Sequence, residues 1–125
     1  MKILVIDDEQ DIKSLFLQRF RREIRENVFH FSFSHSGEDA LAFLKNQGQE
    51  AILILSDINM PGMSGLELLR LIRLNHLLPP PPTVMMITAY GDKENYEQAM
   101  ALGANDFLNK PIDFNALKEK LTNLL

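Results

Sequence analysis

Three short runs of consecutive apolar residues constrain the fold of this chain more than any other feature of its sequence. They are ILVI at residues 3–6, AILIL at 51–55 and VMMI at 84–87. Strands that are apolar on both faces are typical of parallel sheets, because helices cover both sides of such a sheet. Stretches with helical periodicity lie between the runs, so the sequence predicts an α/β fold.

The helical stretches are marked by the spacing of apolar residues and by capping signals. A serine followed three positions later by an acidic residue has the spacing of a capping box, and it occurs at Ser36 and at Ser64. Helices are also expected near the N-terminus, before Gly103 and after Asp113. In chain order, the five helices are expected over about 12–24, from near 37, from near 65, over about 92–102 and from 114. In the first helix, one face is expected to hold Ile12, Leu15, Phe16, Phe20 and Ile24.

The stretch VFHFSFS at 28–34 differs from the other strands because phenylalanine alternates with histidine and serine. A period of two means that one face is buried while the other contacts water, which suits a strand at the edge of a sheet. A fifth strand is expected within NDFLN at 105–109. The strand order 2-1-3-4-5 places the second strand at an edge, so we expect a doubly wound, five-stranded, flavodoxin-like parallel sheet with helices on both faces.

Composition limits the class of protein. The 125 residues suffice for one domain, expected over 1–125, with a single core. No stretch approaches the roughly 20 apolar residues that a membrane helix needs, so we expect a soluble, cytoplasmic protein with no membrane partner. The sequence contains no cysteine, which excludes disulfides and thiolate metal sites. A net charge of −4 without a block of Lys and Arg argues against direct binding of nucleic acid.

Polar residues stand where the predicted strands end. Asp7 and Asp8 follow the first strand, and Asp57 follows the third. Thr88 follows the fourth strand and Lys110 follows the fifth. In an open parallel sheet, ligands bind beyond the carboxyl ends of the strands, so we expect these five side chains to converge. Clustered carboxylates cannot all stay charged without a cation, and a set of oxygen ligands favours Mg²⁺.

An ammonium group and a hydroxyl group beside a metal site indicate phosphate chemistry. The metal alone would need neither Lys110 nor Thr88, but both suit the oxygens of a phosphoryl group. The simplest reaction is attack by the carboxylate of Asp57 on a phosphoryl donor, which gives an aspartyl phosphate. The protein would then contribute mainly positioning and electrostatic stabilisation.

Four motifs of the sequence resemble those of response-regulator receiver domains in two-component signal transduction, and the resemblance covers the full length. The motifs are VIDDE at 5–9, SDINMPGMSG at 56–65, ITAYG at 87–91 and GANDFLNKP at 103–111. The resemblance implies a phosphorylation-activated signalling switch that accepts a phosphoryl group on Asp57 from a sensor histidine kinase or a histidine phosphotransfer protein. It implies no enzyme beyond catalysis of the domain's own phosphorylation and dephosphorylation.

The resemblance also implies which residues hold the Mg²⁺ ion. Asp8 would bind it directly, and Asp7 would bind it largely through water. Asp57 and the main-chain carbonyl of Asn59 would complete the ligands.

Catalytic and switch residues follow from the same resemblance. Lys110 would pair with the phosphoryl group, and the Lys110–Pro111 peptide bond would be cis, a form that is rare except before proline. Thr88 would move to meet the phosphate, and Phe107 would turn inward with it. An effector domain or protein would then bind at the face formed by the fourth helix, the fifth strand and the fifth helix. A homodimer on phosphorylation is expected at the same face.

Several further residues have both a structural and a functional interpretation. Asn59 and Tyr90 lie where the family tunes the lifetime of the phosphoryl group, and the bulky Tyr90 would shield it from water. Pro79–Pro82 is expected to be a stiff connector rather than a site for a proline-reading partner. The three histidines are interpreted as strand, turn and helix-end residues rather than phosphorelay residues: His30, His35 and His76.

Two other functions share part of this pattern. A phosphatase of the haloacid-dehalogenase type also uses Asp, Mg²⁺ and Lys on a parallel α/β sheet, but its Asp-x-Asp motif follows the first strand. Here Asp57 follows the third strand, and Asn59 stands two positions later. A docking domain that has lost phosphorylation is disfavoured because every motif residue is present. Both a free-standing receiver and the receiver of a longer regulator fit the sequence.

Overall fold

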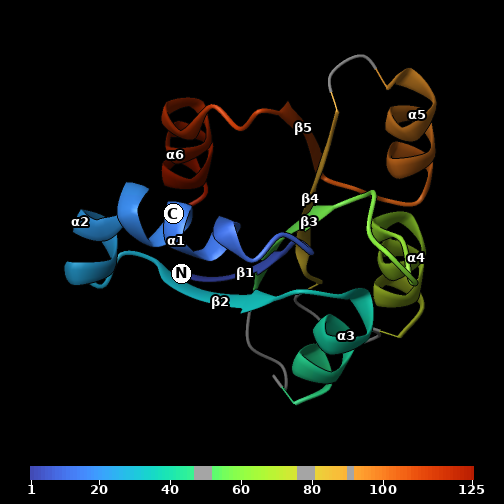
Figure 1. The fold of residues 1–125 in the computed structure, drawn as a ribbon, viewed down its shortest axis with the longest axis horizontal. Coiled ribbons are helices and arrows are strands. Elements are labelled where there is room, and N and C mark those ends of the chain that lie inside the picture. The colour runs from blue at the N-terminus through green and yellow to red at the C-terminus, as the bar shows by residue number, and fades with distance from the viewer. Residues whose placement is uncertain (47–51, 76–80, 90–91) are drawn as a thin grey trace.

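The computed structural model describes residues 1–46, 52–75, 81–89 and 92–125 (Figure 1). Three sequence expectations therefore concern residues outside the described part: those for Tyr90, for His76 and for the first half of Pro79–Pro82. Across the described residues the chain forms five strands and six helices. They are β1 Lys2–Ile6, α1 Asp11–Arg19, α2 Arg21–Arg25, β2 His30–Ser34, α3 Gly37–Lys45, β3 Leu53–Asp57, α4 Gly65–Asn75, β4 Thr83–Ala89, α5 Lys93–Ala101, β5 Asp106–Lys110 and α6 Phe114–Asn123.

The five strands form one parallel sheet in the order β2-β1-β3-β4-β5, which confirms the predicted order. β2 lies at one edge, as its alternating pattern predicts. His30 is exposed, whereas Phe31 and Phe33 are half-buried. Ser32 and Ser34 depart from the pattern, since Ser32 is also half-buried and Ser34 is buried where β2 turns into α3.

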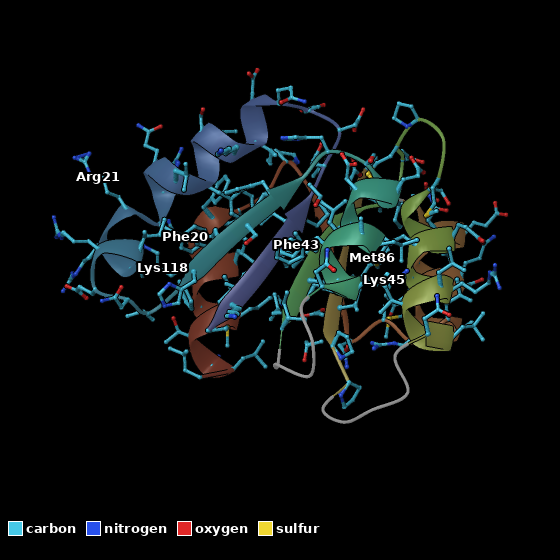
Figure 2. The ribbon with its side chains drawn as sticks, turned by 90° about the horizontal axis from the view of Figure 1, so that it is seen from below. Phe20, Arg21, Phe43, Lys45, Met86 and Lys118 are labelled. Carbon is cyan, nitrogen blue, oxygen red and sulfur yellow. The ribbon has the colours of Figure 1, made fainter. Side chains whose placement is uncertain are left out.

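Helices cover both faces of the sheet (Figure 1). One face packs against α3, α4 and α5 through an apolar cluster that includes Leu4, Ile54 and Met86. The other face packs against α1 and α6 through a cluster rich in phenylalanine. Figure 2 shows the two layers from below, with Phe20 and Met86 on opposite faces. The central strands are buried on both sides, which explains why their sequences are continuous apolar runs.

The first predicted helix is broken, which corrects the expectation of one helix over 12–24. The backbone of Phe20 leaves the helical region, with φ −108° and ψ 20°, so that α1 ends and α2 begins on either side of it. The buried ring of Phe20 lies 5.2 Å from that of Phe31 and 6.2 Å from that of Phe114. Leu15 is 41% exposed, so its expected burial is also wrong. The reason is geometric, because Leu15 lies about 100° around the helix from the buried Phe16.

The predicted helix starts are confirmed. The hydroxyl of Ser36 accepts the N–H of Asp39 at 3.1 Å, and the hydroxyl of Ser64 accepts the N–H of Glu67 at 3.2 Å. α6 begins after Asp113 as predicted. Within the described ranges, the structure has no helix with the length and apolar character that crossing a membrane requires.

Candidate functional site

The carboxyl ends of the strands bring the predicted polar residues to one edge of the sheet. Asp57 is the last residue of β3 and lies in register with Ile87 of β4. Thr88 is the next residue of β4, and Lys110 is the last residue of β5. These residues are therefore part of the strands rather than just beyond them, because the ladders continue one or two residues further than the apolar runs.

Asp7, Asp8 and Asp57 form one acidic cluster. Each offers a carboxylate oxygen that lies within 4.8 Å of an oxygen of the other two. Asp7 is 2% exposed and Asp57 is 5% exposed, whereas Asp8 is the most solvent-accessible of the three. Carboxylate oxygens this close repel one another unless a cation lies among them. The donor set consists of oxygen atoms alone, which suits a hard divalent ion such as Mg²⁺.

Lys110 is the cation that the structure places against this cluster. Its Nζ donates to Asp57 Oδ2 at 3.0 Å and to Asp7 Oδ2 at 3.2 Å. The lysine side chain is 30% exposed, so the pair lies at the rim of the site. The peptide bond between Lys110 and Pro111 is cis, the isomer that the family resemblance implies.

The environment perturbs both members of the pair. Burial raises the pKa of Asp57 above its ordinary value, and the nearby Asp7 adds to this effect. Lys110 and the backbone N–H of Asn59 lower that pKa but do not offset burial. Burial alone would lower the pKa of Lys110, but the two carboxylates outweigh it and raise that pKa. The ionised site is therefore short of positive charge, as expected for a carboxylate that works with a bound cation.

Thr88 has an unused hydroxyl group. The residue is fully buried, and its Oγ1 has no hydrogen-bond partner among the residues that the structure describes. A buried hydroxyl without a partner is energetically unfavourable and usually has a functional explanation. The hydroxyl is thus available as a donor to a group that binds at the strand ends.

A tight loop connects Asp57 to α4. The N–H of Gly65 donates to the carbonyl of Ile58 at 2.8 Å. A Cβ atom at position 65 would lie only 2.0 Å from the main-chain oxygen of Asp57, so no residue other than glycine fits there. Asn59 lies in this loop and is exposed. The loop holds the residues after the carboxylate close to the end of β3.

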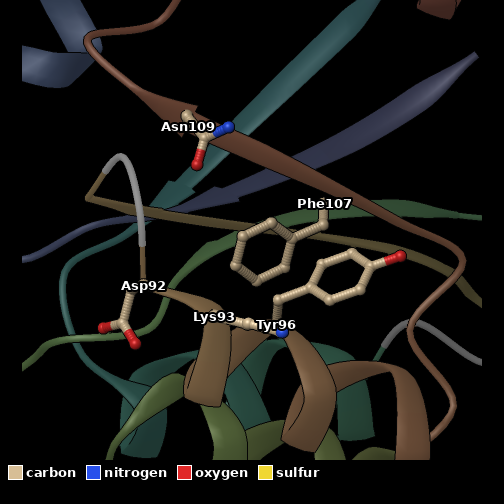
Figure 3. A pocket seen from close by; sticks show the side chains of 5 residues that line it. All are labelled: Asp92, Lys93, Tyr96, Phe107 and Asn109. Carbon is tan, nitrogen blue, oxygen red and sulfur yellow. The ribbon is translucent and has the colours of Figure 1, made fainter.

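Phe107 lies apart from the acidic cluster, on the side of the sheet that carries α5. Its half-buried ring makes an edge contact with Tyr96 of α5, at 5.2 Å between ring centres and 83° between ring planes. Figure 3 shows the edge contact of the two rings. Both rings line a shallow pocket with a volume of about 270 Å³. Residues from the start of α5 and from β5 complete its lining: Asp92, Lys93 and Asn109.

Sequence reasoning missed two residues that contact this site. Nδ1 of His35 lies 3.0 Å from the main-chain oxygen of Asp7, and the carboxylate of Glu38 accepts the N–H of Met63 in the loop after Asp57. His35 was correctly expected in a turn. Its position directly after β2, at the same end of the sheet as the other polar strand ends, is the sequence signal that could have pointed to the site.

Comparison with known proteins gives an independent result. The family model described as response regulator receiver domain matches residues 3–122. The response regulator protein PilR of Pseudomonas aeruginosa is 35% identical over 127 residues, which covers 99% of this chain and 26% of PilR. The chain spans between 18% and 49% of the length of PilR and two further curated relatives.

Solved structures agree with this result. The chemotaxis response regulator CheY4 of Vibrio cholerae superposes with a TM-score of 0.80 at 25% identity, covering 99% of this chain and 98% of CheY4. The response regulator TrrA of Thermotoga maritima, solved in complex with Mg²⁺-BeF, gives a TM-score of 0.75 at 32% identity over 99% of this chain and 98% of TrrA. The matched model, the relatives and the shared fold show that this chain belongs to the response regulator receiver domain family.

Proposed function

We propose that Asp57 is the phosphoacceptor of a two-component pathway and that it takes its phosphoryl group from a phosphohistidine on a sensor kinase or a histidine phosphotransfer protein. Receiver domains are signalling domains that act as phosphorylation-activated switches. The observation that carries the assignment to Asp57 is the Nζ of Lys110, which lies 3.0 Å from a carboxylate buried in an acidic cluster. A buried carboxylate that is paired with an ammonium group and opens at a sheet edge is suited to nucleophilic attack on phosphorus.

Mg²⁺ fits the residues present. We assign Asp7, Asp8, Asp57 and the main-chain carbonyl of Asn59 as the residues that hold it, because the three carboxylates form a cluster of oxygen donors. When bound, the ion neutralises charge on the phosphoryl oxygens. TrrA, which was solved in complex with Mg²⁺-BeF, supports the same choice of metal.

The reaction is a transfer between two nucleophiles. A carboxylate oxygen of Asp57 forms a bond to phosphorus while the bond from phosphorus to the donor imidazole nitrogen breaks, and the electron pair stays on that nitrogen. Lys110 moves its ammonium contact from the carboxylate to a phosphoryl oxygen. The hydroxyl of Thr88 donates to another phosphoryl oxygen, which gives this buried group the partner that it lacks.

We further propose that the response is expressed at the face formed by α5, β5 and α6. These are the fourth helix, fifth strand and fifth helix of the sequence prediction, renumbered because the first helix is split. Movement of Thr88 toward the phosphate would let Phe107 turn inward and leave its contact with Tyr96. An effector domain or protein, or a second copy of the chain, would bind this face in its changed conformation. Asn59 and Tyr90 would set how long the phosphoryl group survives.

The first experiment is intact mass after incubation with acetyl phosphate, with and without Mg²⁺, on the wild type and on Asp57→Asn. We expect a gain of one phosphate that requires Mg²⁺ and is absent in the variant. A phosphorylated Asp57→Asn chain would place the acceptor elsewhere. An unmodified wild type that also accepts nothing from a phosphorylated histidine phosphotransfer protein would indicate a docking domain.

The phosphatase alternative is tested with the same proteins. Because the matched family is a receiver domain, we expect no turnover of an added phosphomonoester such as p-nitrophenyl phosphate. Multiple turnovers that depend on Asp57 would favour the phosphatase instead.

A further inference from the structure

The last residue of β2 and the residue that follows it both contact the main chain of Asp7. The main-chain oxygen of Ser34 accepts the N–H of Asp7 at 3.1 Å, which continues the β1–β2 ladder by one bond. His35 Nδ1 lies 3.0 Å from the main-chain oxygen of Asp7. A carbonyl oxygen can only accept, so Nδ1 carries the hydrogen and donates it. Both backbone groups of Asp7, its N–H and its carbonyl, are therefore hydrogen-bonded to residues at the end of β2.

The first turn of α3, directly after His35, contacts the loop that follows Asp57. The carboxylate of Glu38 accepts the N–H of Met63 at 3.2 Å. Gly37 lies directly against Met63, since a Cβ atom at position 37 would be 2.8 Å from its sulfur. α3 and α4 lie side by side on one face of the sheet (Figure 1), and these contacts join the first turn of α3 to the loop that leads into α4.

Starting α3 does not require these contacts. The hydroxyl of Ser36 already caps the helix by accepting the N–H of Asp39. His35 and Glu38 instead direct their hydrogen bonds away from α3, toward β1 and toward the β3–α4 loop respectively. A purely local role in the turn leaves both long-range bonds unexplained.

We propose that residues 34–38 form a bracket that sets the separation between Asp7 and the loop after Asp57, and thereby the affinity of the acidic cluster for Mg²⁺. This inference rests on the proposed function, because it concerns the same metal site. His35 and Glu38 are positioning residues, since each bonds the main chain of a neighbouring segment and not a carboxylate of the cluster. Mg²⁺ tolerates little deviation from octahedral geometry, so small shifts of the two segments weaken binding.

The test measures the affinity for Mg²⁺ alone, by titration calorimetry on the unphosphorylated chain. We expect His35→Ala and Glu38→Ala each to weaken binding about threefold to tenfold, less than the loss typical of groups that bond the ligand atoms themselves. His35→Asn keeps an N–H donor near the position of Nδ1, and Glu38→Gln keeps an acceptor oxygen. Both conservative variants should bind within about twofold of the wild type.

Two controls separate positioning from general loss of structure. His30→Ala removes an exposed histidine from the opposite end of β2 and should leave the affinity unchanged. Thermal unfolding in metal-free buffer verifies that each variant is folded at the temperature of the titration. Glu38 is exposed, so Glu38→Ala is expected to fold even where His35→Ala does not.

The outcomes distinguish the bracket from the proposed function. If the wild type binds Mg²⁺ and the folded alanine variants bind it equally well, the bracket is overturned and the phosphoacceptor assignment stands. Folded His35→Asn and Glu38→Gln variants that bind as weakly as the alanine variants also overturn the bracket. A wild type that binds no Mg²⁺ overturns both. Loss in the alanine variants with recovery in the conservative ones supports the bracket.

Discussion

At the scale of single residues, Asp57 combines burial with charge. Its carboxylate is 5% exposed, close to Asp7 and paired with Lys110. Burial raises its pKa, because the surroundings penalise the charged form more than Lys110 favours it. The residue that accepts the phosphoryl group in the proposed function is thus also one that destabilises the ionised, metal-free fold.

This leads to a prediction for Asp57→Asn in metal-free buffer. A native pKa above the unfolded value means that the native chain binds the proton more tightly. The stability that Asp57 contributes is complete below its ordinary pKa and is lost as the pH rises through the raised native value. The asparagine side chain in the variant cannot ionise, so the variant does not lose this stability as the pH rises. Lys110 keeps its contact with Asp7.

We therefore expect the variant to be more stable than the wild type at neutral pH, by an amount that shrinks as the pH falls. Urea unfolding at several pH values measures the difference. A variant that is less stable than the wild type at pH 7 would contradict the raised pKa.

The tight loop after Asp57 requires a glycine at position 65. A Cβ at this position would lie 2.0 Å from the main-chain oxygen of Asp57, which is backbone and cannot move away without displacing the site. We expect Gly65→Ala to lower the free energy of unfolding by about 3 kcal/mol, at the upper end of the usual range for single substitutions. Urea denaturation measures this loss.

Gly37→Ala is the matched control for Gly65→Ala. The atoms nearest to a Cβ at position 37 would all belong to the side chain of Met63, with its sulfur at 2.8 Å and its Cβ and Cγ at 3.0 Å, and none would be backbone. Its loss of stability should be clearly smaller. Equal losses in the two variants would mean that the contact with the Asp57 backbone is not the cause.

At the scale of elements, the helix caps follow local rules. The carboxylate of Asp113 accepts the N–H groups of Asn115 and Ala116, both at 3.1 Å, and so satisfies two donors at the start of α6. We expect Asp113→Ala to cost about 1 kcal/mol of stability. Asp113→Asn retains an acceptor and should cost much less. Chemical denaturation of both variants tests this, and an Asn variant as unstable as the Ala variant would argue for a charge effect instead of capping.

The break between α1 and α2 shows where local rules stop. The apolar spacing continues through Phe20, and nothing in the sequence near it ends a helix. The chain nevertheless leaves helical geometry there, because the ring packs among phenylalanines from β2 and α6 that are distant in sequence. The N–H of Val28 then bonds the carbonyl of Glu23 at 2.8 Å, which leads the chain from α2 into β2.

At the scale of the whole molecule, the proposed switch couples the buried hydroxyl of Thr88 to the face formed by α5, β5 and α6. Thr88 lies on β4, and Phe107 lies on the neighbouring β5 against Tyr96 of α5. Moving a two-state domain from 1:99 to 99:1 needs about 5.5 kcal/mol of preference for the active state. A phosphoryl group adds nearly two negative charges, and its contacts with Lys110 and Thr88 must supply that preference.

Thr88→Ala separates the chemistry from the response. The variant keeps Asp57, Lys110 and the acidic cluster, so we expect it still to accept phosphate from acetyl phosphate, more slowly than the wild type because one donor to the phosphoryl oxygens is missing. It lacks the hydroxyl, so most of the phosphorylation-dependent shift in amide resonances of α5, β5 and α6 should disappear. A full response in the phosphorylated variant would remove Thr88 from the switch.

Thr88→Ser is the conservative partner of this variant. It retains the hydroxyl and should retain most of the response. The comparison also controls for the lost methyl group, since both Ser and Ala lack it.

The sequence by itself determined the parallel sheet, its order, the starts of the capped helices and the family. These depend on information within a few residues: apolar runs, serine caps and four short motifs. Because polar residues at the carboxyl ends of parallel strands share one edge of the sheet, the sequence also predicts that Asp7, Asp57 and Lys110 lie together. Their hydrogen bonds then follow from the register of neighbouring strands.

Only the tertiary structure decided the break at Phe20, the exposure of Leu15 and the contacts of His35 and Glu38 with the site. Each of these depends on side chains or backbone groups that meet across elements far apart in the chain. His35 and Asp7, for example, are 28 positions apart, and no local preference of either residue encodes their hydrogen bond. Packing between layers fixes such contacts, because it selects one arrangement from many that satisfy the same local rules.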